Sequence, residues 1–216
     1  MKKTGTLVFI FVFALFKAVC YGNFLDENIP VNNKRYRTFA LCLDELERRG
    51  AKVIVETGTS RNGKKNCLGD GCSTCIFSNW AFENNGTLFS VDISRQALKE
   101  AENALGIEKS SVFFVEEDSI EFLQNFEGEI DFLYLDSFDF DKKNPKPSQL
   151  HHLKEIQAAL PHLSPEGFVM IDDCLLPFGG KGALVIEFLK SKGWEVLFSG
   201  YQVIMTPGKS HPSIKN

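Results

Sequence analysis

The chain has 216 residues, a length that fits one domain able to bury its own core. Hydrophobic residues make up 44% of the sequence and charged residues 24%, as in an ordinary soluble globular protein. The formal net charge of −4 gives no general attraction to phosphate backbones, so nucleic acid is not the expected partner.

An export segment is expected over residues 1–22. Two lysines precede an apolar run from Leu7 to Phe16, which is too short for a bilayer-spanning helix and fits a secretory signal peptide. Small residues near Cys20 and Gly22 suit cleavage. The protein is then expected to be periplasmic or secreted. The alternative is an uncleaved N-terminal anchor, which would be its one contact with a membrane.

A polar linker is expected at 23–33, one folded domain at 34–207 and a disordered tail at 208–216. The order of the expected elements predicts a Rossmann-like three-layer α/β/α sandwich with a mostly parallel sheet. In chain order they are a helix at 36–49, a strand at 53–55, a helix at 73–83, a strand at 87–91, a helix at 94–105, a strand at 111–115, a helix at 118–126, a strand at 130–135, a helix at 148–163, a strand at 168–171, a helix at 183–192, and a hairpin of strands at 194–198 and 201–205 with a two-residue turn.

Acidic residues follow four of the predicted strands. They are Glu56, Asp92, Asp136 and the pair Asp172-Asp173. The carboxyl ends of parallel strands meet at one edge of a sheet, where ligands bind, so we expect these carboxylates to converge there. The alternative, in which each acid only caps a helix or a turn, explains single residues better than the whole set.

The turn after the first predicted strand points to the kind of ligand. Gly58 allows a sharp turn and a close backbone approach, but the segment lacks the G-x-G-x-x-G pattern of pyrophosphate binders. The carboxylate of Glu56 would repel a pyrophosphate and suit an ammonium or sulfonium group. Asp92, at the end of the next strand, can bind both hydroxyls of a ribose.

Five strings resemble the motifs of class I S-adenosylmethionine-dependent methyltransferases: VETGT at 55–59, SVDIS at 90–94, EEDSIEFL at 116–123, FLYLDS at 132–137 and GFVMIDDC at 167–174. The resemblance covers roughly residues 51–207. It implies a seven-stranded sheet whose C-terminal hairpin strand is antiparallel, with S-adenosylmethionine as cofactor. The cofactor-binding residues that it implies are Glu56, Gly58, Thr59, Ser60, Asp92, Ile93, Asp118, Ser119 and Asp136.

Asp136 with Asp172 and Asp173 resembles the metal triad of catechol-, macrolide- and sugar-type O-methyltransferases. Three carboxylates without histidine or cysteine suit a hard cation such as Mg²⁺. A metal ion there would orient a substrate hydroxyl and lower its pKa. The expected function is therefore magnesium-assisted O-methylation of a small hydroxylated molecule. The alternative for the pair is a cap on the loop that follows.

The general base of such a reaction has two candidates. The catechol-type enzymes keep a lysine shortly after the residue that corresponds to Asp136, and this chain has Asp139 there instead. His151 and His152 open the next predicted helix near the same edge, and histidine is the commonest base near neutral pH. Asp139 and His151 are the candidates that we carry forward.

Cys67, Cys72 and Cys75 are the closest group among six cysteines. Their spacing invites a zinc site, but a fourth ligand is missing nearby. In an exported protein a loop disulfide is favoured, joining Cys67 to Cys72 or to Cys75.

Two other functions stay open at this point. One is a different enzyme on the same scaffold, similar to the cephalosporin-hydroxylase group, and the other is a non-catalytic exported ligand-binding protein. Export itself raises the question of how a cofactor made in the cytosol reaches the site. The sequence leaves the substrate and the oligomeric state undetermined.

Overall fold

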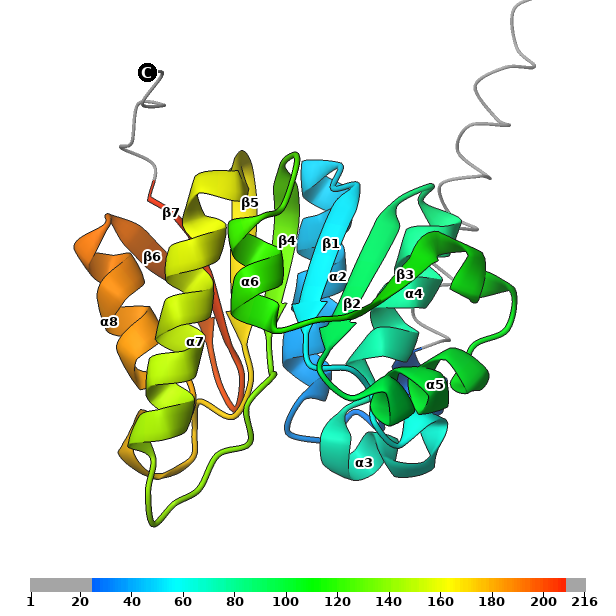
Figure 1. Ribbon diagram of the computed structural model, residues 1–216, viewed down its shortest axis with the longest axis horizontal. Helices are drawn as coiled ribbons and strands as arrows, with labels where there is room; N and C mark the ends of the chain where they lie inside the picture. The colour runs from blue at the N-terminus through cyan, green and yellow to red at the C-terminus, as the bar shows by residue number, and fades with distance from the viewer. Residues whose placement is uncertain (1–24, 209–216) are drawn as a thin grey trace, which may run out of the picture.

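The computed structural model describes residues 25–208, which form the coloured part of Figure 1. The predicted export segment lies outside the described residues, as does the predicted tail beyond residue 208. Within the described part, no helix is long and apolar enough to cross a membrane.

A seven-stranded sheet with the strand order β3-β2-β1-β4-β5-β7-β6 forms the centre of the fold. The first five strands pair in parallel, and β7 runs antiparallel to both β5 and β6. The predicted sheet and its antiparallel hairpin strand are thus confirmed. The strands are β1 (Val53–Thr57), β2 (Thr87–Asp92), β3 (Val112–Glu116), β4 (Ile130–Leu135), β5 (Leu163–Ile171), β6 (Trp194–Ser199) and β7 (Val203–Pro207).

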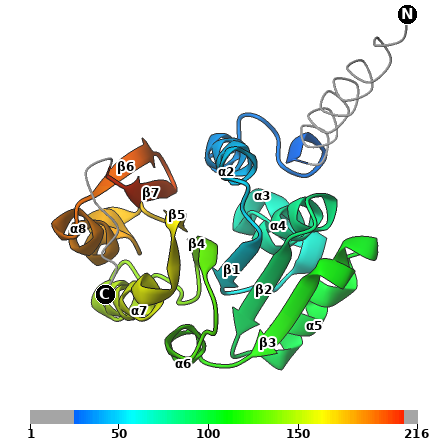
Figure 2. The same cartoon turned by 90° about the horizontal axis from the view of Figure 1, so that it is seen from above.

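Helices cover both faces of the sheet (Figure 2). Helices α2 and α4 lie on one face, and α6, α7 and α8 lie on the other. The α-helices are α2 (Tyr36–Arg49), α3 (Cys67–Asp70), α4 (Ser73–Glu83), α5 (Arg95–Ala104), α6 (Ser119–Gln124), α7 (Lys146–Ala159) and α8 (Ala183–Ser191). Short 3-10 turns are η1 (Gly63–Asn66), η2 (Ile107–Ser111), η3 (Leu160–His162) and η4 (Pro177–Gly179).

Two hydrophobic cores follow from the alternation of side chains along the strands. Phe132 and Tyr134 of β4 pack with α2 and α4, whereas Leu133 and Leu135 pack with α6, α7 and α8. Successive residues of a strand point to opposite faces, so a strand covered on both sides is apolar at most positions. This explains the continuous apolar runs of the sequence and leaves the strand ends for polar residues.

Two predicted segments differ in the structure. Residues 25–33 are not a free linker, because Leu25 and Ile29 are buried in the core beneath α2. An apolar pair four residues apart was the signal for this packing. The predicted two-residue hairpin turn is also wrong: Ser199 pairs with Val203, which leaves three residues, 200–202, in the turn.

Candidate functional site

A cavity of about 600 Å³ opens at the carboxyl ends of the central strands. It lies where the strand order reverses between β1 and β4, the usual ligand position in an open α/β sheet. Nine residues singled out from the sequence line it: Gly58, Thr59, Ser60, Asp92, Ile93, Asp136, Asp139, Asp172 and Asp173. Residues that were not predicted line it as well, among them three cations and an aromatic residue: Arg35, Arg61, Lys181 and Tyr201.

The turn after β1 is pressed against the end of β4. Gly58 adopts a positive φ of 83°, and its amide donates a hydrogen bond of 2.8 Å to the carbonyl of Val91. A Cβ atom on this residue would lie 2.6 Å from the carbonyl oxygen of Asp136. Glycine is therefore required here both by the backbone conformation and by the close approach of the two strands.

Asp92 fixes the same turn from the neighbouring strand. Its carboxylate accepts hydrogen bonds from the amide of Thr59 at 3.2 Å and from the amide of Ser94 at 2.8 Å. A carboxylate oxygen can accept more than one hydrogen bond, so Asp92 keeps the capacity to accept from a ligand in the cavity.

Asp136, Asp172 and Asp173 come together at the other side of the cavity. They directly follow β4 and β5, and one ligand atom from each lies within 4.8 Å of the others. The predicted convergence of the strand-end acids is confirmed for these three and for Asp92, which all line one cavity.

Lys181 lies inside this acidic cluster. Its ammonium group forms a close ion pair with Oδ1 of Asp136 and lies 3.4 Å from Oδ2 of Asp173. The side chain is only 3% exposed. Burial works against the charged form, but the three aspartates outweigh it and raise the pKa of Lys181. The surrounding carboxylates therefore favour the charged form of the lysine.

Arg35, just before α2, supplies the second cation. Its Nε donates to both carboxylate oxygens of Asp172 at 3.1 Å, and its Nη2 donates to Oδ2 at 2.7 Å. The same Nη2 lies 3.2 Å from Asp173, whose carboxylate also accepts a hydrogen bond from the hydroxyl of Tyr201. Burial opposes the charge of Arg35, but Asp172 outweighs it and raises its pKa further.

The three aspartates form a candidate site for a divalent ion. Three carboxylates within 4.8 Å are the right ligands for Mg²⁺. However, Lys181 contacts the carboxylates of Asp136 and Asp173, and Arg35 engages both oxygens of Asp172. A metal ion would have to share these oxygens with two buried cations. The residues as arranged do not fit Mg²⁺.

Residues 68–174, about half of the chain, match the family model described as a methyltransferase domain. This segment runs from α3 to the residue after Asp173 and includes Asp92, Asp136 and both aspartates that follow β5. The chain is an S-adenosylmethionine-dependent methyltransferase. No curated protein matches its sequence.

Solved structures show the same fold for the whole methyltransferase. A protein from Staphylococcus aureus described as a caffeoyl-CoA O-methyltransferase is 17% identical, with 95% of this chain and 93% of that one covered at a TM-score of 0.58. A Podospora anserina methyltransferase, solved with S-adenosylhomocysteine (SAH) bound, is 14% identical over 97% and 99% at a TM-score of 0.56. The O-methyltransferase NovP is 14% identical over 82% and 80% at a TM-score of 0.54.

Glu56 of the methyltransferase takes a different position from the one the resemblance implied. Its side chain is fully buried and is not among the residues that line the cavity. One carboxylate oxygen accepts hydrogen bonds from the hydroxyls of Thr74 at 2.5 Å and Ser90 at 2.6 Å. Burial raises the pKa of Glu56 to about 7. Glu56 thus links β1 to β2 and α4 through these buried hydrogen bonds.

Asp118 and Ser119, which the resemblance implies as cofactor-binding residues, also stand outside the cavity lining. Asp118 caps α6 by accepting hydrogen bonds from the amides of Ile120 and Glu121, at 2.9 and 3.2 Å. The hydroxyl of Ser119 lies 3.2 Å from Nε2 of His151 on α7. Their contact with a cofactor remains a prediction.

Neither candidate for the general base is placed for that role. Asp139 lines the cavity, but its carboxylate pairs with Arg61 at 2.6 and 2.9 Å, and this hydrogen bond lowers its pKa. His151 is not among the cavity residues. Burial disfavours its charged form, but the hydrogen bond to Glu155 and the negative charges of Glu155 and Asp118 together raise its pKa.

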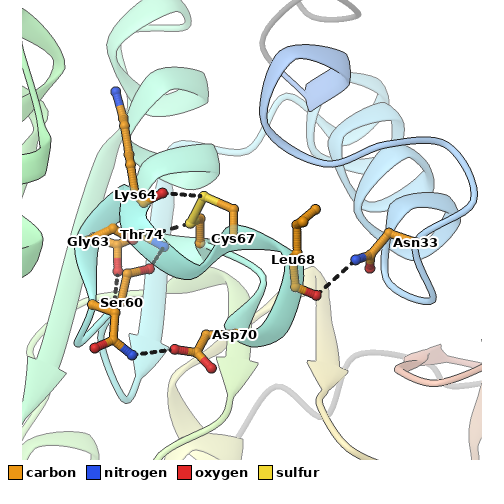
Figure 3. The surroundings of a disulfide bond; sticks show 10 residues. Asn33, Ser60, Gly63, Lys64, Cys67, Leu68, Asp70 and Thr74 are labelled. Atoms are coloured by element: carbon orange, nitrogen blue, oxygen red, sulfur yellow. Dashed lines mark hydrogen bonds between the residues drawn. A yellow bond between two sulfur atoms is a disulfide. The ribbon is translucent and has the colours of Figure 1, made fainter.

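A disulfide between Cys67 and Cys72 closes the loop that borders the cavity (Figure 3). This is one of the two pairings expected from the sequence, and Cys75 remains a buried free thiol. Outside the loop, the side-chain Nδ2 of Asn33 donates a hydrogen bond of 3.0 Å to the carbonyl of Leu68 and so holds the loop in place. Within the loop, the carbonyl of Gly69 accepts a hydrogen bond of 2.6 Å from Arg35. The disulfide loop therefore helps to hold Arg35 in the cavity.

Arg35 and Lys181 are the functional residues that sequence reasoning missed. Arg35 contacts an aspartate 137 positions away, so no local pattern reports the pairing. Lys181 stood in a recognisable context, the run Gly179-Gly180-Lys181-Gly182 shortly after the paired aspartates. A basic residue among glycines, close to a cluster of acids at a strand end, was the available signal.

Proposed function

We propose that the protein transfers a methyl group from S-adenosylmethionine to a hydroxyl oxygen of a small molecule. The observation that carries the proposal is a single cavity bordered by the Gly58 turn, Asp92 and the Asp136 cluster. Two of the structural neighbours, at 17% and 14% identity, are described as O-methyltransferases.

Bound S-adenosylmethionine would supply a methyl group on a sulfonium sulfur. The acceptor oxygen would bond to the methyl carbon as the carbon–sulfur bond breaks with its electron pair on sulfur, and the hydroxyl proton would pass to solvent water. In this proposal Asp92 accepts hydrogen bonds from the ribose hydroxyls. The open turn at Gly58 lets the backbone approach the ligand closely. Asp136 and Lys181 face the acceptor and fix its oxygen in line with the methyl group.

The proposed reaction uses no Mg²⁺. The prediction of Mg²⁺ rested on three aspartates without nearby cations, and the two cations Arg35 and Lys181 change the chemistry of the cluster. Oxygen methylation needs an electrostatic partner for the hydroxyl, and an ammonium group can fill that position as well as a metal ion.

Calorimetry with S-adenosylmethionine and with its demethylated product tests the cofactor. The wild-type protein is expected to bind both, and Asp92→Ala to raise both dissociation constants about tenfold or more, because a hydrogen bond to a charged group contributes roughly 1.5–3 kcal/mol. Asp44→Ala, an exposed aspartate on α2, serves as the matched control and should bind like the wild type.

Absence of binding to both ligands at millimolar concentration would remove the proposal. If the protein binds S-adenosylmethionine but forms none of its demethylated product with any of a panel of phenols and sugars, the result would instead favour a non-catalytic binding protein.

We further propose that the protein is exported with its N-terminal segment removed. The Cys67–Cys72 disulfide supports this, because such bonds persist in oxidising compartments. Mass spectrometry of the protein from its native source, without reduction, is expected to find a mature N-terminus near Gly22 and a linked peptide pair containing both cysteines. An intact N-terminus with two free thiols would contradict export.

A further inference from the structure

Lys181 occupies the place between carboxylates where a bridging cation would lie. Its ammonium group contacts Asp136 and Asp173, which follow two neighbouring strands. Magnesium ligands lie about 2.1 Å from the ion. Both oxygens of Asp173 are already engaged, Oδ2 by Lys181 and Oδ1 by Arg35 and Tyr201, so an ion bridging the two residues would have to share an oxygen of Asp173 with a buried cation.

The backbone around Lys181 keeps the side chain in this position. Gly180 has a positive φ of 54°, and a Cβ atom on it would lie only 1.7 Å from the carbonyl oxygen of Asp173. The segment before α8 is thus packed directly onto the backbone that carries the paired aspartates. Lys181 itself is 2% exposed, so moving its ammonium group away from the acids would bury a charge without a partner.

Charge counting supports the same assignment. With all three aspartates ionised they contribute −3, and Arg35 and Lys181 contribute +2, so the cluster carries a formal charge no more negative than −1. Mg²⁺ gives up its hydration water reluctantly, so a protein site must attract it with carboxylates whose negative charge is not already compensated. One residual negative charge beside two fixed cations provides little of that attraction.

We propose that Lys181 is the resident cation of this site, so that the protein takes no divalent ion there and presents an ammonium group to the acceptor hydroxyl. The second half of this statement rests on the proposed function. The first half concerns cation binding alone and is testable without knowledge of the acceptor.

Titration with Mn²⁺, followed by the loss of its free electron paramagnetic resonance signal, tests the proposal. The wild-type protein should show no saturable binding up to millimolar Mn²⁺. Lys181→Met removes the ammonium group and keeps the apolar chain, and it should bind one Mn²⁺ at least tenfold more tightly than the wild type. Adding Asp136→Asn to that variant should abolish the gain.

Lys190→Met, an exposed lysine on α8, is the matched control and should leave Mn²⁺ binding unchanged. Stoichiometric micromolar Mn²⁺ binding by the wild type, lost in Asp136→Asn, would overturn the proposal, and this measurement needs no Lys181 variant to fold. A Lys181→Met protein that still binds S-adenosylmethionine but gains no Mn²⁺ affinity would overturn it as well. Calorimetry with S-adenosylmethionine on the same samples reports separately on the proposed function.

Discussion

Replacing Arg35 with methionine is expected to lower the free energy of unfolding by about 3–5 kcal/mol, the usual cost of leaving one partner of a buried ion pair alone. Asp172 is 1% exposed, and among the described residues its side chain accepts hydrogen bonds from Arg35 alone. Without the guanidinium, the buried carboxylate is left without the partner of its ion pair. Urea denaturation at neutral pH measures the effect.

Arg48→Met provides the control for this variant, because Arg48 forms an ion pair with Glu45 on the surface of α2 and its side chain is 62% exposed. Its loss should change stability by no more than about 0.5 kcal/mol. Combining Arg35→Met with Asp172→Asn should recover part of the lost stability, since the unpaired charge is then gone. Equal effects of Arg35→Met and Arg48→Met would refute the role assigned to the buried pair.

Gly58→Ala is the second substitution with a large expected effect, on stability and on cofactor binding together. An alanine at this positive φ is strained, and its Cβ would meet the backbone of Asp136 and Ser137 within 3 Å. Strain and overpacking of this kind cost about 2–4 kcal/mol. Because β1 and β4 would separate at the cavity, affinity for S-adenosylmethionine should fall at least tenfold in the same protein, as read by calorimetry.

Gly50→Ala separates the strain of a positive φ from the steric overlap of the new Cβ atom with neighbouring backbone. Gly50 ends α2 at a positive φ of 65°, but no atom lies within 4 Å of the position of its Cβ. Its substitution carries the conformational cost alone, about 1 kcal/mol, and should leave cofactor affinity unchanged. If Gly58→Ala and Gly50→Ala have equal effects on stability and on affinity for S-adenosylmethionine, the close approach of β1 and β4 at Gly58 is not needed for cofactor binding.

The sheet and the acidic cluster were predictable because short stretches of the sequence determine both. A strand buried on both faces is apolar at most positions, and the residues at its carboxyl end lie at the sheet edge. This placed Asp92, Asp136, Asp172 and Asp173 together. Gly58 was likewise visible as the one glycine at a strand end that needed a sharp turn.

The charge balance of the site was not predictable in the same way. Arg35 and Lys181 meet the aspartates through the folded topology, and a carboxylate in a sequence carries no mark of the cation that will neutralise it. Glu56 illustrates the same limit: its place at a strand end suggested a ligand contact, but the side chain turns inward to Thr74 and Ser90. Which face a strand-end side chain takes depends on the packing around it.

Both cations of the acidic cluster, Arg35 and Lys181, lie outside the segment of this chain that matches the family model. The matched region ends at residue 174 and begins at residue 68, whereas the counter-charges sit at positions 35 and 181. Relatives that share the aspartates can therefore differ in what neutralises them, and a homologue with uncharged residues at those two positions would present an open acidic cluster. Sorting the family by these flanking positions would divide it along lines that its shared motifs do not reveal.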